Sequence, residues 1–165
     1  MIIVLMGVSG AGKTTVGQLL AAELGWPFYD ADDFHPASNI QAMRAGRALT
    51  DADRAAWLDA LHQLARTLVR DGVSAVLACS ALTQRYRERL IGGDAAIAAA
   101  IHFVYLRGAP ELIRRRLEAR ARHFMPASLL PSQFAILEEP RAAVVVDVSA
   151  APATIVQRIR RALRV

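Results

Sequence analysis

The chain of 165 residues is short of three residue types, since cysteine, lysine and asparagine each occur once. Because Cys79 has no second cysteine to pair with, an internal disulfide is excluded, which fits a reducing, cytoplasmic setting. No run approaches the roughly 18 apolar residues of a membrane-spanning helix, so we expect no membrane partner. The apolar start lacks the basic residues that open an export signal, and it is better explained as a buried first strand.

The scarcity of lysine makes the basic side chains almost uniformly arginine. Of 20 lysines and arginines, only Lys13 is a lysine, and a compact, flexible ammonium at one place is not interchangeable with a guanidinium. The formal net charge of +5 suits either nucleic acid or anionic small substrates. With 54% apolar and 21% charged residues, the chain has material for a core and predicts one compact domain over residues 1–165.

The lone lysine lies in the most informative motif of the chain. Residues 7–14 match G-x-x-x-x-G-K-[ST] at every fixed position, with an apolar strand before them and a helical pattern after them. In such a loop the backbone N–H groups surround phosphate oxygens, the lysine reaches the β- and γ-phosphates, and the final hydroxyl binds Mg²⁺. A glycine-rich turn without a ligand is the alternative, and the strand–loop–helix context argues against it. The predicted ATP and Mg²⁺ site comprises Gly7, Val8, Ser9, Gly10, Ala11, Gly12, Lys13 and Thr14, with Thr15 as a weaker candidate.

Apolar strands and helical patterns alternate along the whole chain. Strands are expected at 2–6, 26–29, 73–79, 101–106 and 143–148, and helices at 14–24, 38–45, from 50, from 80, from 110, at 132–137 and at 152–163. Strands that are apolar throughout and alternate with helices indicate a parallel sheet covered on both faces. The predicted fold is therefore an α/β three-layer sandwich of the P-loop NTPase type. Ligands of such folds bind beyond the carboxyl ends of the strands, where the loop, Asp30, Ser80 and Arg107 are expected to converge.

Two acidic residues follow the second expected strand. Carboxylates at Asp30 and Asp32 could hold Mg²⁺ through water and accept a proton from a sugar hydroxyl. The alternative is a turn or helix-capping role, which we favour for Asp33.

Arginine is densest between residues 114 and 122. Phosphoryl transfer relies on charge neutralisation, so a cationic lid is expected near the phosphates. Arg116 and Arg120 are four residues apart and share a helix face, which suits that lid. A solvated arginine face or an RNA-binding patch is the alternative, and a solvated face is favoured for Arg114 and Arg115. Since no aromatic residues are interleaved to stack bases, we expect no nucleic-acid partner.

Two other classes of P-loop protein fit the sequence poorly. A GTPase switch would show D-x-x-G and N-K-x-D, but no glycine has an aspartate three residues before it, and Asn39 precedes an isoleucine. A motor ATPase usually needs a longer chain.

Motifs along most of the chain resemble the gluconate kinases, small P-loop enzymes related to shikimate and nucleoside monophosphate kinases. The shared segments are GVSGAGKTT, DADDFHP with NIQAM, G-x-x-L-x-D-x-D-R-x-x-W-L from Gly46 to Leu58, CSAL with YRERL, YLRG, R-x-R-H-F-M-P, LL-x-SQF and LEEP. The loop alone is shared by a large superfamily, whereas D-x-D-x-x-H-P together with CSAL and HFMP is far narrower.

The resemblance implies transfer of the ATP γ-phosphate to the 6-hydroxyl of D-gluconate by a homodimer with a nucleoside-monophosphate-kinase-like lid. It places the acceptor-binding segment at about residues 30–58 and the lid at about residues 114–131. Asp32 would position or deprotonate the hydroxyl and Asp30 would assist the metal. The implied acceptor residues are His35, Arg54 and Ser80, with Arg54 or Arg85 as the carboxylate clamp; those of the lid are Arg116, Arg120 and Arg122, oriented by His123 and Gln133.

Two positions depart from the family pattern. Ala31 replaces a glycine, a small change that should leave the neighbouring acids in place. Thr83 replaces the lysine that usually follows C-S-A-L, which bears on efficiency and acceptor choice and leaves Arg85 as a stand-in. Two alternatives therefore stay open: another small-acid or sugar kinase of this fold, and a basic, nucleotide-regulated nucleic-acid-binding protein.

Overall fold

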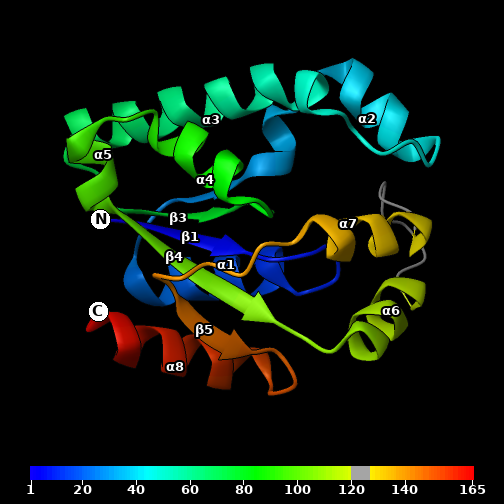
Figure 1. Cartoon of the computed structure of the whole chain (residues 1–165). Helices are drawn as coiled ribbons and strands as arrows, with labels where there is room; N and C mark the ends of the chain where they lie inside the picture. The colour runs from blue at the N-terminus through cyan, green and yellow to red at the C-terminus, as the bar shows by residue number, and fades with distance from the viewer. Residues whose placement is uncertain (120–126) are drawn as a thin grey trace.

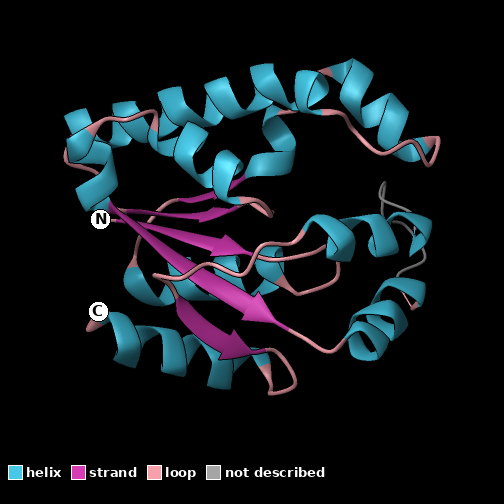
Figure 2. Ribbon diagram, viewed as in Figure 1, coloured by secondary structure: helices cyan, strands magenta, loops and turns pink. Residues whose placement is uncertain are grey.

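A five-stranded parallel sheet forms the middle layer of the molecule, in the order β2-β3-β1-β4-β5 (Figures 1 and 2). The computed structural model describes residues 1–119 and 127–165. The strands are β1 (Ile2–Met6), β2 (Phe28–Asp30), β3 (Ala75–Ala78), β4 (Ile101–Arg107) and β5 (Val144–Asp147). All four strand pairings are parallel, so the carboxyl ends meet at one edge. The predicted five-stranded parallel sheet is confirmed.

Helices cover both faces of this sheet (Figure 2). The α-helices are α1 (Lys13–Leu24), α2 (Ala37–Arg44), α3 (Asp51–Arg70), α4 (Gln84–Ile91), α5 (Ala95–Ala100), α6 (Pro110–Glu118), α7 (Leu130–Ile136) and α8 (Pro152–Leu163). Two short 3₁₀ helices are η1 (Ala31–Phe34) and η2 (Ala127–Leu129). In Figure 1, α3, α4 and α5 lie on one side of the sheet and α1 and α8 on the other, which gives the predicted three layers.

The central strand β1 is buried on both faces because its side chains alternate between two apolar clusters. Ile3 and Leu5 pack with residues of α1 and α8. Ile2, Val4 and Met6 pack instead with residues of α3, α4 and α5. A strand that is apolar at every position is the pattern such a central parallel strand requires.

The long helix α3, expected from residue 50, begins at a capping box. The Thr50 hydroxyl accepts from the Asp53 N–H at 3.2 Å, and the Asp53 carboxylate accepts from the Thr50 N–H at 2.8 Å. Each such cap stabilises a helix by about 1 kcal/mol. Since Asp53 closes the box, Asp51 is left to bond elsewhere.

The structure differs from the predicted elements in several places, including β3, which begins at Ala75 rather than at residue 73, and α4, which begins at Gln84 rather than at residue 80. The helix α5 was not predicted, and Asp94 caps it by accepting from Ala96 and Ile97. The strand β2 begins at Phe28, so Trp26 and Pro27 precede it. Helix α6 ends at Glu118, and the remaining part of the arginine-dense stretch falls largely outside the described residues. Within the described residues, no helix is long and apolar enough to cross a membrane.

Candidate active site

The phosphate loop joins the carboxyl end of β1 to the start of α1. Gly7 and Gly10 have φ values of +141° and +85°, which side-chain-bearing residues rarely adopt. A Cβ on Gly7 would lie 2.9 Å from the Leu106 carbonyl oxygen, and one on Gly10 would lie 2.8 Å from a Leu117 side-chain carbon. Glycine at both positions is therefore a steric requirement of the loop.

Lys13 is held over this loop by the loop's own backbone. Its ammonium donates to the carbonyl oxygens of Gly7 at 3.0 Å and Val8 at 3.1 Å. Such bonds keep a flexible side chain near the mouth of the loop, where the phosphates of a nucleotide would arrive. The contact explains in geometric terms why a compact ammonium suits this position.

Thr14 and Asp30 meet beside the loop. The Thr14 hydroxyl donates to Asp30 Oδ2 at 2.7 Å, while Asp30 Oδ1 accepts from the Asp32 N–H at 3.1 Å. Magnesium is commonly bound by one or two protein oxygens together with waters and substrate phosphates, so this pair fits such an ion. Within residues 1–119 and 127–165, no group of three or more His, Cys, Asp or Glu side chains could hold a metal alone.

Next to the loop lies a cavity that brings together seven of the predicted site residues. They come from the phosphate loop, η1, α3, the turn after β3 and α7, and they are Ser9, Lys13, Asp32, His35, Arg54, Ser80 and Gln133. Further lining residues include Met43, Leu49, Trp57 and Tyr86. The cavity therefore combines a carboxylate, two cationic groups and several neutral hydrogen-bonding groups on an apolar wall.

His35 lies flat against Trp57 in this cavity. The ring centroids are 4.4 Å apart with an interplanar angle of 11°. Trp57 is fixed in turn because its Nε1–H donates to the Ala31 carbonyl oxygen at 2.7 Å. Burial, reinforced by the positive charge of Arg54, lowers the pKa of His35 to about 4, so the ring is neutral near pH 7.

Arg54 reaches the cavity from the first turn of α3. Its guanidinium donates to the Leu49 carbonyl oxygen and to the Tyr86 hydroxyl, the latter at 3.2 Å, and lies 5.3 Å from the centre of the Tyr86 ring. The Tyr86 hydroxyl donates to Asp51 at 2.6 Å. This bond is the main reason that the pKa of Asp51 is lowered, with further contributions from the charges of Arg85 and Arg54. Arg54 is thus held in place at the wall of the cavity.

Two other predicted site residues, Arg85 and Arg116, are not among the described lining residues of the cavity. Arg85 bonds Asp51 at 2.7 Å with 73% of its side chain exposed, and it is not among the described lining residues of the cavity. Arg116 donates to the Val148 carbonyl oxygen at 2.7 Å, just beyond β5. The other lid predictions, Arg120, Arg122 and His123, lie outside the described residues. Thr15 is exposed on α1.

Gln133 connects α7 to the phosphate loop. Its Oε1 accepts from the Ser9 N–H at 2.7 Å, and its Nε2 lies 3.3 Å from the Ser9 hydroxyl oxygen. These two contacts join residues 124 positions apart in the chain. The segment after the predicted lid therefore touches the loop directly.

The turn after β3 brings Ser80 to the same edge. Its carbonyl oxygen accepts from the Gly7 N–H at 3.2 Å, which ties this turn to the phosphate loop. Ala81 follows with φ of +42°, and the buried Arg87 donates to the Ala81 carbonyl oxygen at 2.9 Å. Cys79 is fully enclosed, and burial raises the pKa of its thiol to about 12, so it packs as a core residue.

Three residues that support the site had no individual role predicted from the sequence. Asn39, Trp57 and Tyr86 lie within the family motifs NIQAM, G-x-x-L-x-D-x-D-R-x-x-W-L and YRERL, but a motif does not say what each of its members contacts. Their roles come from contacts across 14 to 32 residues, such as the bonds of Asn39 to Asp53 and of Tyr86 to Arg54. Spacing along a helix does not report such contacts.

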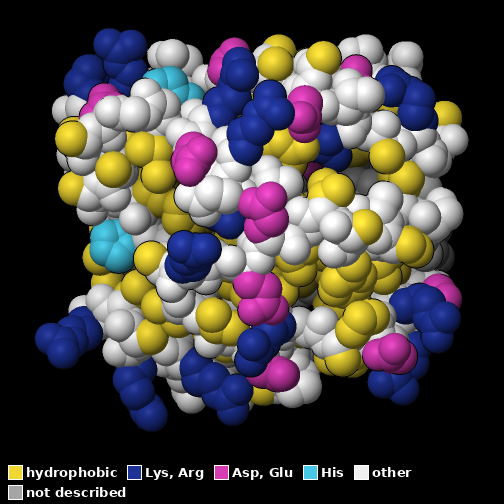
Figure 3. Space-filling view, in the orientation of Figure 1, with side chains coloured by type: hydrophobic (Ala, Val, Ile, Leu, Met, Phe, Trp, Pro, Cys, Tyr) yellow, Lys and Arg dark blue, Asp and Glu magenta, His cyan; other side chains and the backbone are white. Residues whose placement is uncertain are grey.

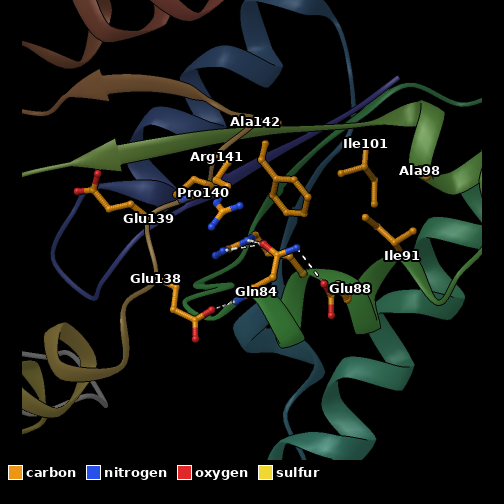
Figure 4. A pocket seen from close by; sticks show the side chains of 12 residues that line it. Gln84, Glu88, Ile91, Ala98, Ile101, Glu138, Glu139, Pro140, Arg141 and Ala142 are labelled. Carbon is orange, nitrogen blue, oxygen red and sulfur yellow. Dashed lines mark hydrogen bonds between the residues drawn. The ribbon is translucent and has the colours of Figure 1, made fainter.

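A larger open cavity lies away from the phosphate loop, between α4, the start of β4 and residues 138–142 (Figure 4). Glu138 and Glu139 line one end and Ile91 and Ile101 the other. None of the predicted site residues is among its described lining. Three carboxylates and two arginines surround its apolar floor, and its described lining includes neither the phosphate loop nor Asp32.

Comparison with known proteins agrees with this geometry. A family model described as an AAA domain matches residues 2–140. A gluconokinase of Gluconobacter oxydans is 51% identical over 84% of this chain and 75% of its own length. The thermosensitive gluconokinase of Escherichia coli is 40% identical over 97% and 86%.

A solved structure extends the likeness from sequence to fold. The crystal structure of a gluconokinase from Sinorhizobium meliloti superposes with a TM-score of 0.84 at 39% identity, covering 98% of this chain and 90% of that one. Similarity at these identities over most of the chain means that the chain belongs to the gluconokinase family.

Proposed function

We propose that the chain transfers the γ-phosphate of ATP to the 6-hydroxyl of D-gluconate, giving 6-phospho-D-gluconate and ADP. The observation that carries the proposal is the cavity in which Lys13 of the phosphate loop faces Asp32 and Arg54. Such a cavity combines a phosphate-side cation, an acid for the hydroxyl proton and a guanidinium for a carboxylate. Relatives named gluconokinases match most of the chain.

On the acceptor side, Arg54 binds the gluconate carboxylate, since a guanidinium fork matches two carboxylate oxygens. Asp32 accepts the proton of the 6-hydroxyl as the hydroxyl oxygen attacks the γ-phosphorus. The new oxygen–phosphorus bond forms while the bond from the γ-phosphorus to the bridging oxygen of ADP breaks. His35 and Ser80 bind the remaining hydroxyl groups.

On the phosphate side, the loop N–H groups and Lys13 bind the phosphate oxygens and offset the charge that spreads over them during transfer. Thr14 and Asp30 would hold Mg²⁺, which supplies further neutralisation of the phosphates when bound. Arg116 and Arg120 serve the lid. In the described arrangement Arg116 bonds the Val148 carbonyl oxygen, so that role requires it to exchange this bond for a phosphate.

Another small-acid kinase of this fold is the second candidate, and Thr83 is the observation that favours it. Thr83 caps α4 by accepting from the Tyr86 N–H at 3.2 Å, so it supports the helix and brings no charge. Arg54 already supplies a cation to the cavity from another element. The missing charge at position 83 is what favours a different acid, whereas the guanidinium of Arg54 supports gluconate as the acceptor.

The partner predictions belong to the same proposal. On the face in Figure 3, lysine and arginine side chains are spread out and interspersed with aspartate and glutamate, which supports a small-molecule rather than a nucleic-acid partner. A homodimer and a cytoplasmic location remain predictions from the family resemblance and from the single cysteine. Size-exclusion chromatography with light scattering tests the dimer.

The experiment that tests the reaction identifies its product. Purified protein is incubated with Mg·ATP and D-gluconate, and ³¹P NMR follows the phosphorus. The proposal predicts a new phosphate monoester coupled to the C6 protons, together with ADP. A phosphate on any other carbon, or ADP without an ester, would contradict it.

A further inference from the structure

Asn39, the single asparagine of the chain, is buried between His35 and the start of α3. It lies in the first turn of α2, and only 3% of its surface is exposed. It is not among the lining residues of the acceptor cavity. Any effect it has on the acceptor must therefore pass through a neighbour.

The contacts of Asn39 fix the orientation of its amide. Asn39 Nδ2 lies 2.7 Å from the Asp53 carbonyl oxygen, which can only accept, so the amide NH₂ group points there. The same nitrogen lies 3.4 Å from His35 Nδ1. One N–H serves Asp53, and the second is directed at the histidine.

This orientation determines the proton position on His35. Since Asn39 offers a hydrogen to Nδ1, a hydrogen on Nδ1 would face another hydrogen. Nδ1 therefore accepts, and in a neutral imidazole the proton must lie on Nε2. Trp57 covers one face of the ring, and among the described residues none bonds Nε2. Since His35 lines the cavity, we infer that Nε2–H is the polar group it offers to a ligand there.

Burial first, and then the positive charge of Arg54, keeps the ring in the neutral form. Arg54 from α3 and Lys13 from the phosphate loop line the same cavity, as does Asp32 from η1. The Asp53 carboxylate, also on α3, is already bonded to Thr50 and Arg47. Burial and the positive charge of Arg54 both disfavour protonation of His35.

We propose that Asn39 is a positioning residue that holds His35 in the Nε2–H tautomer, so that His35 donates a hydrogen bond to an oxygen of the acceptor. The identity of that acceptor rests on the function proposed above, whereas the tautomer does not. His35 thus joins Lys13 and Arg54 as a donor in the cavity, where Asp32 is the one carboxylate among the described lining residues. The cavity is therefore matched to a polyhydroxy acid and mismatched to an amine, whose N–H groups would face donors.

The tautomer is tested without turnover. Long-range ¹H–¹⁵N correlation on protein labelled at histidine reports which ring nitrogen carries the proton, and His35→Gln assigns the signal. The proposal predicts a neutral ring protonated on Nε2 at pH 7. A ring protonated on Nδ1, or a charged ring, overturns it.

Kinetics of three variants test the consequence. Asn39→Asp replaces the amide NH₂ by a carboxylate oxygen that only accepts, so the bond to the Asp53 carbonyl oxygen is lost, the proton of His35 moves to Nδ1 and the ring becomes easier to charge. We expect the KM for gluconate to rise about 10-fold with the KM for ATP within about twofold, the scale of one lost hydrogen bond. The pH profile of kcat/KM for Asn39→Asp should also show an ionisation between pH 5 and 8 that the wild-type profile lacks.

The other two variants separate the donor from the ring. His35→Gln supplies an N–H near the position of Nε2 and should raise the KM for gluconate clearly less than His35→Phe, which keeps the stacking on Trp57 and should raise it about 10-fold or more. Equal kinetics for Gln and Phe would overturn the donor role. Absence of gluconate turnover in the wild-type protein, with the Nε2–H tautomer observed, would instead refute the proposed function alone.

Discussion

The two halves of the cavity are built in different ways. On the phosphate side, Lys13 bonds carbonyl groups five and six residues earlier, and Thr14 bonds Asp30 16 residues later. On the acceptor side, the bonds that position Trp57, Arg54 and Tyr86 span 26, 32 and 35 residues. A contiguous motif carries its own geometry, whereas an acceptor pocket exists only once distant elements have packed. Substitutions in the two halves should therefore change different kinetic parameters.

The largest effect is expected from Lys13→Ala, which removes the cation of the phosphate side. Loss of one charge-stabilising group in a phosphoryl-transfer site lowers kcat by about 10²- to 10³-fold. Lys13→Arg should be similarly impaired because a planar guanidinium cannot occupy the position between the Gly7 and Val8 carbonyl groups. Steady-state ADP release at saturating gluconate measures both. A Lys13→Arg protein with near wild-type kcat would contradict the geometric argument.

The next effect separates the two candidate carboxylate clamps, Arg54 and Arg85. Arg54→Ala removes a guanidinium from the cavity wall, and loss of a charged hydrogen bond of about 1.5–3 kcal/mol should raise the KM for gluconate by about 10- to 150-fold. Arg85→Ala breaks only an exposed ion pair, worth about 0–1 kcal/mol, so its KM should change by less than about fivefold. The KM for ATP should stay unchanged in both. A larger rise in the KM for gluconate with Arg85→Ala than with Arg54→Ala would mean that Arg85, on α4, binds the carboxylate.

A smaller effect is expected where the halves meet, at Gln133. Gln133→Ala leaves the Ser9 N–H without its partner, and one neutral hydrogen bond of about 0.5–1.5 kcal/mol corresponds to a change of about 2- to 10-fold. Because the bond joins α7 to the phosphate loop, we expect the KM for both substrates to rise. Ser132→Ala, on the preceding residue, is the matched control. A change confined to one substrate would show that Gln133 serves one half only.

The last effect is on stability rather than on kinetics, and it concerns the pH dependence of unfolding. His35 has a pKa of about 4 when folded, below the value of about 6.5 for an unfolded histidine. The unfolded state therefore binds more protons, so stability is full above about pH 6.5 and falls as the pH decreases toward 4. Urea unfolding at pH 7.5 and pH 5 should show a larger decrease in the midpoint for the wild-type protein than for His35→Gln. Equal decreases would mean that His35 is not the group responsible.

Much of the fold was predictable because it depends on local patterns. Apolar strands alternating with helices predict a parallel sheet, and the helices expected from residues 50 and 110 begin in the structure at the Thr50 capping box and at Pro110. Helix α5 was missed since five of its six residues are alanine, which leaves no apolar periodicity to detect. The strand order was not predicted because it depends on crossovers that no local pattern records.

The same distinction between local patterns and long-range contacts applies to the residues of the site. The family motifs named Asp32, His35, Arg54 and Ser80, and all four line the cavity. Their supports, Asn39, Trp57 and Tyr86, act through contacts between elements that are distant in sequence. The choice between Arg54 and Arg85 could not be made from residue type, because both are arginines near helix starts. Only the packing of α3 against α4 puts one in the cavity and the other in solvent.

The most direct test of the whole account is ADP release from Mg·ATP with a panel of acceptors: D-gluconate, shikimate, glycerate and neutral sugars, with Lys13→Ala as background. The account predicts turnover that depends on D-gluconate, far exceeds that with the other acceptors and vanishes in the background protein. Turnover that prefers another acid would keep the kinase and contradict gluconate as the acceptor.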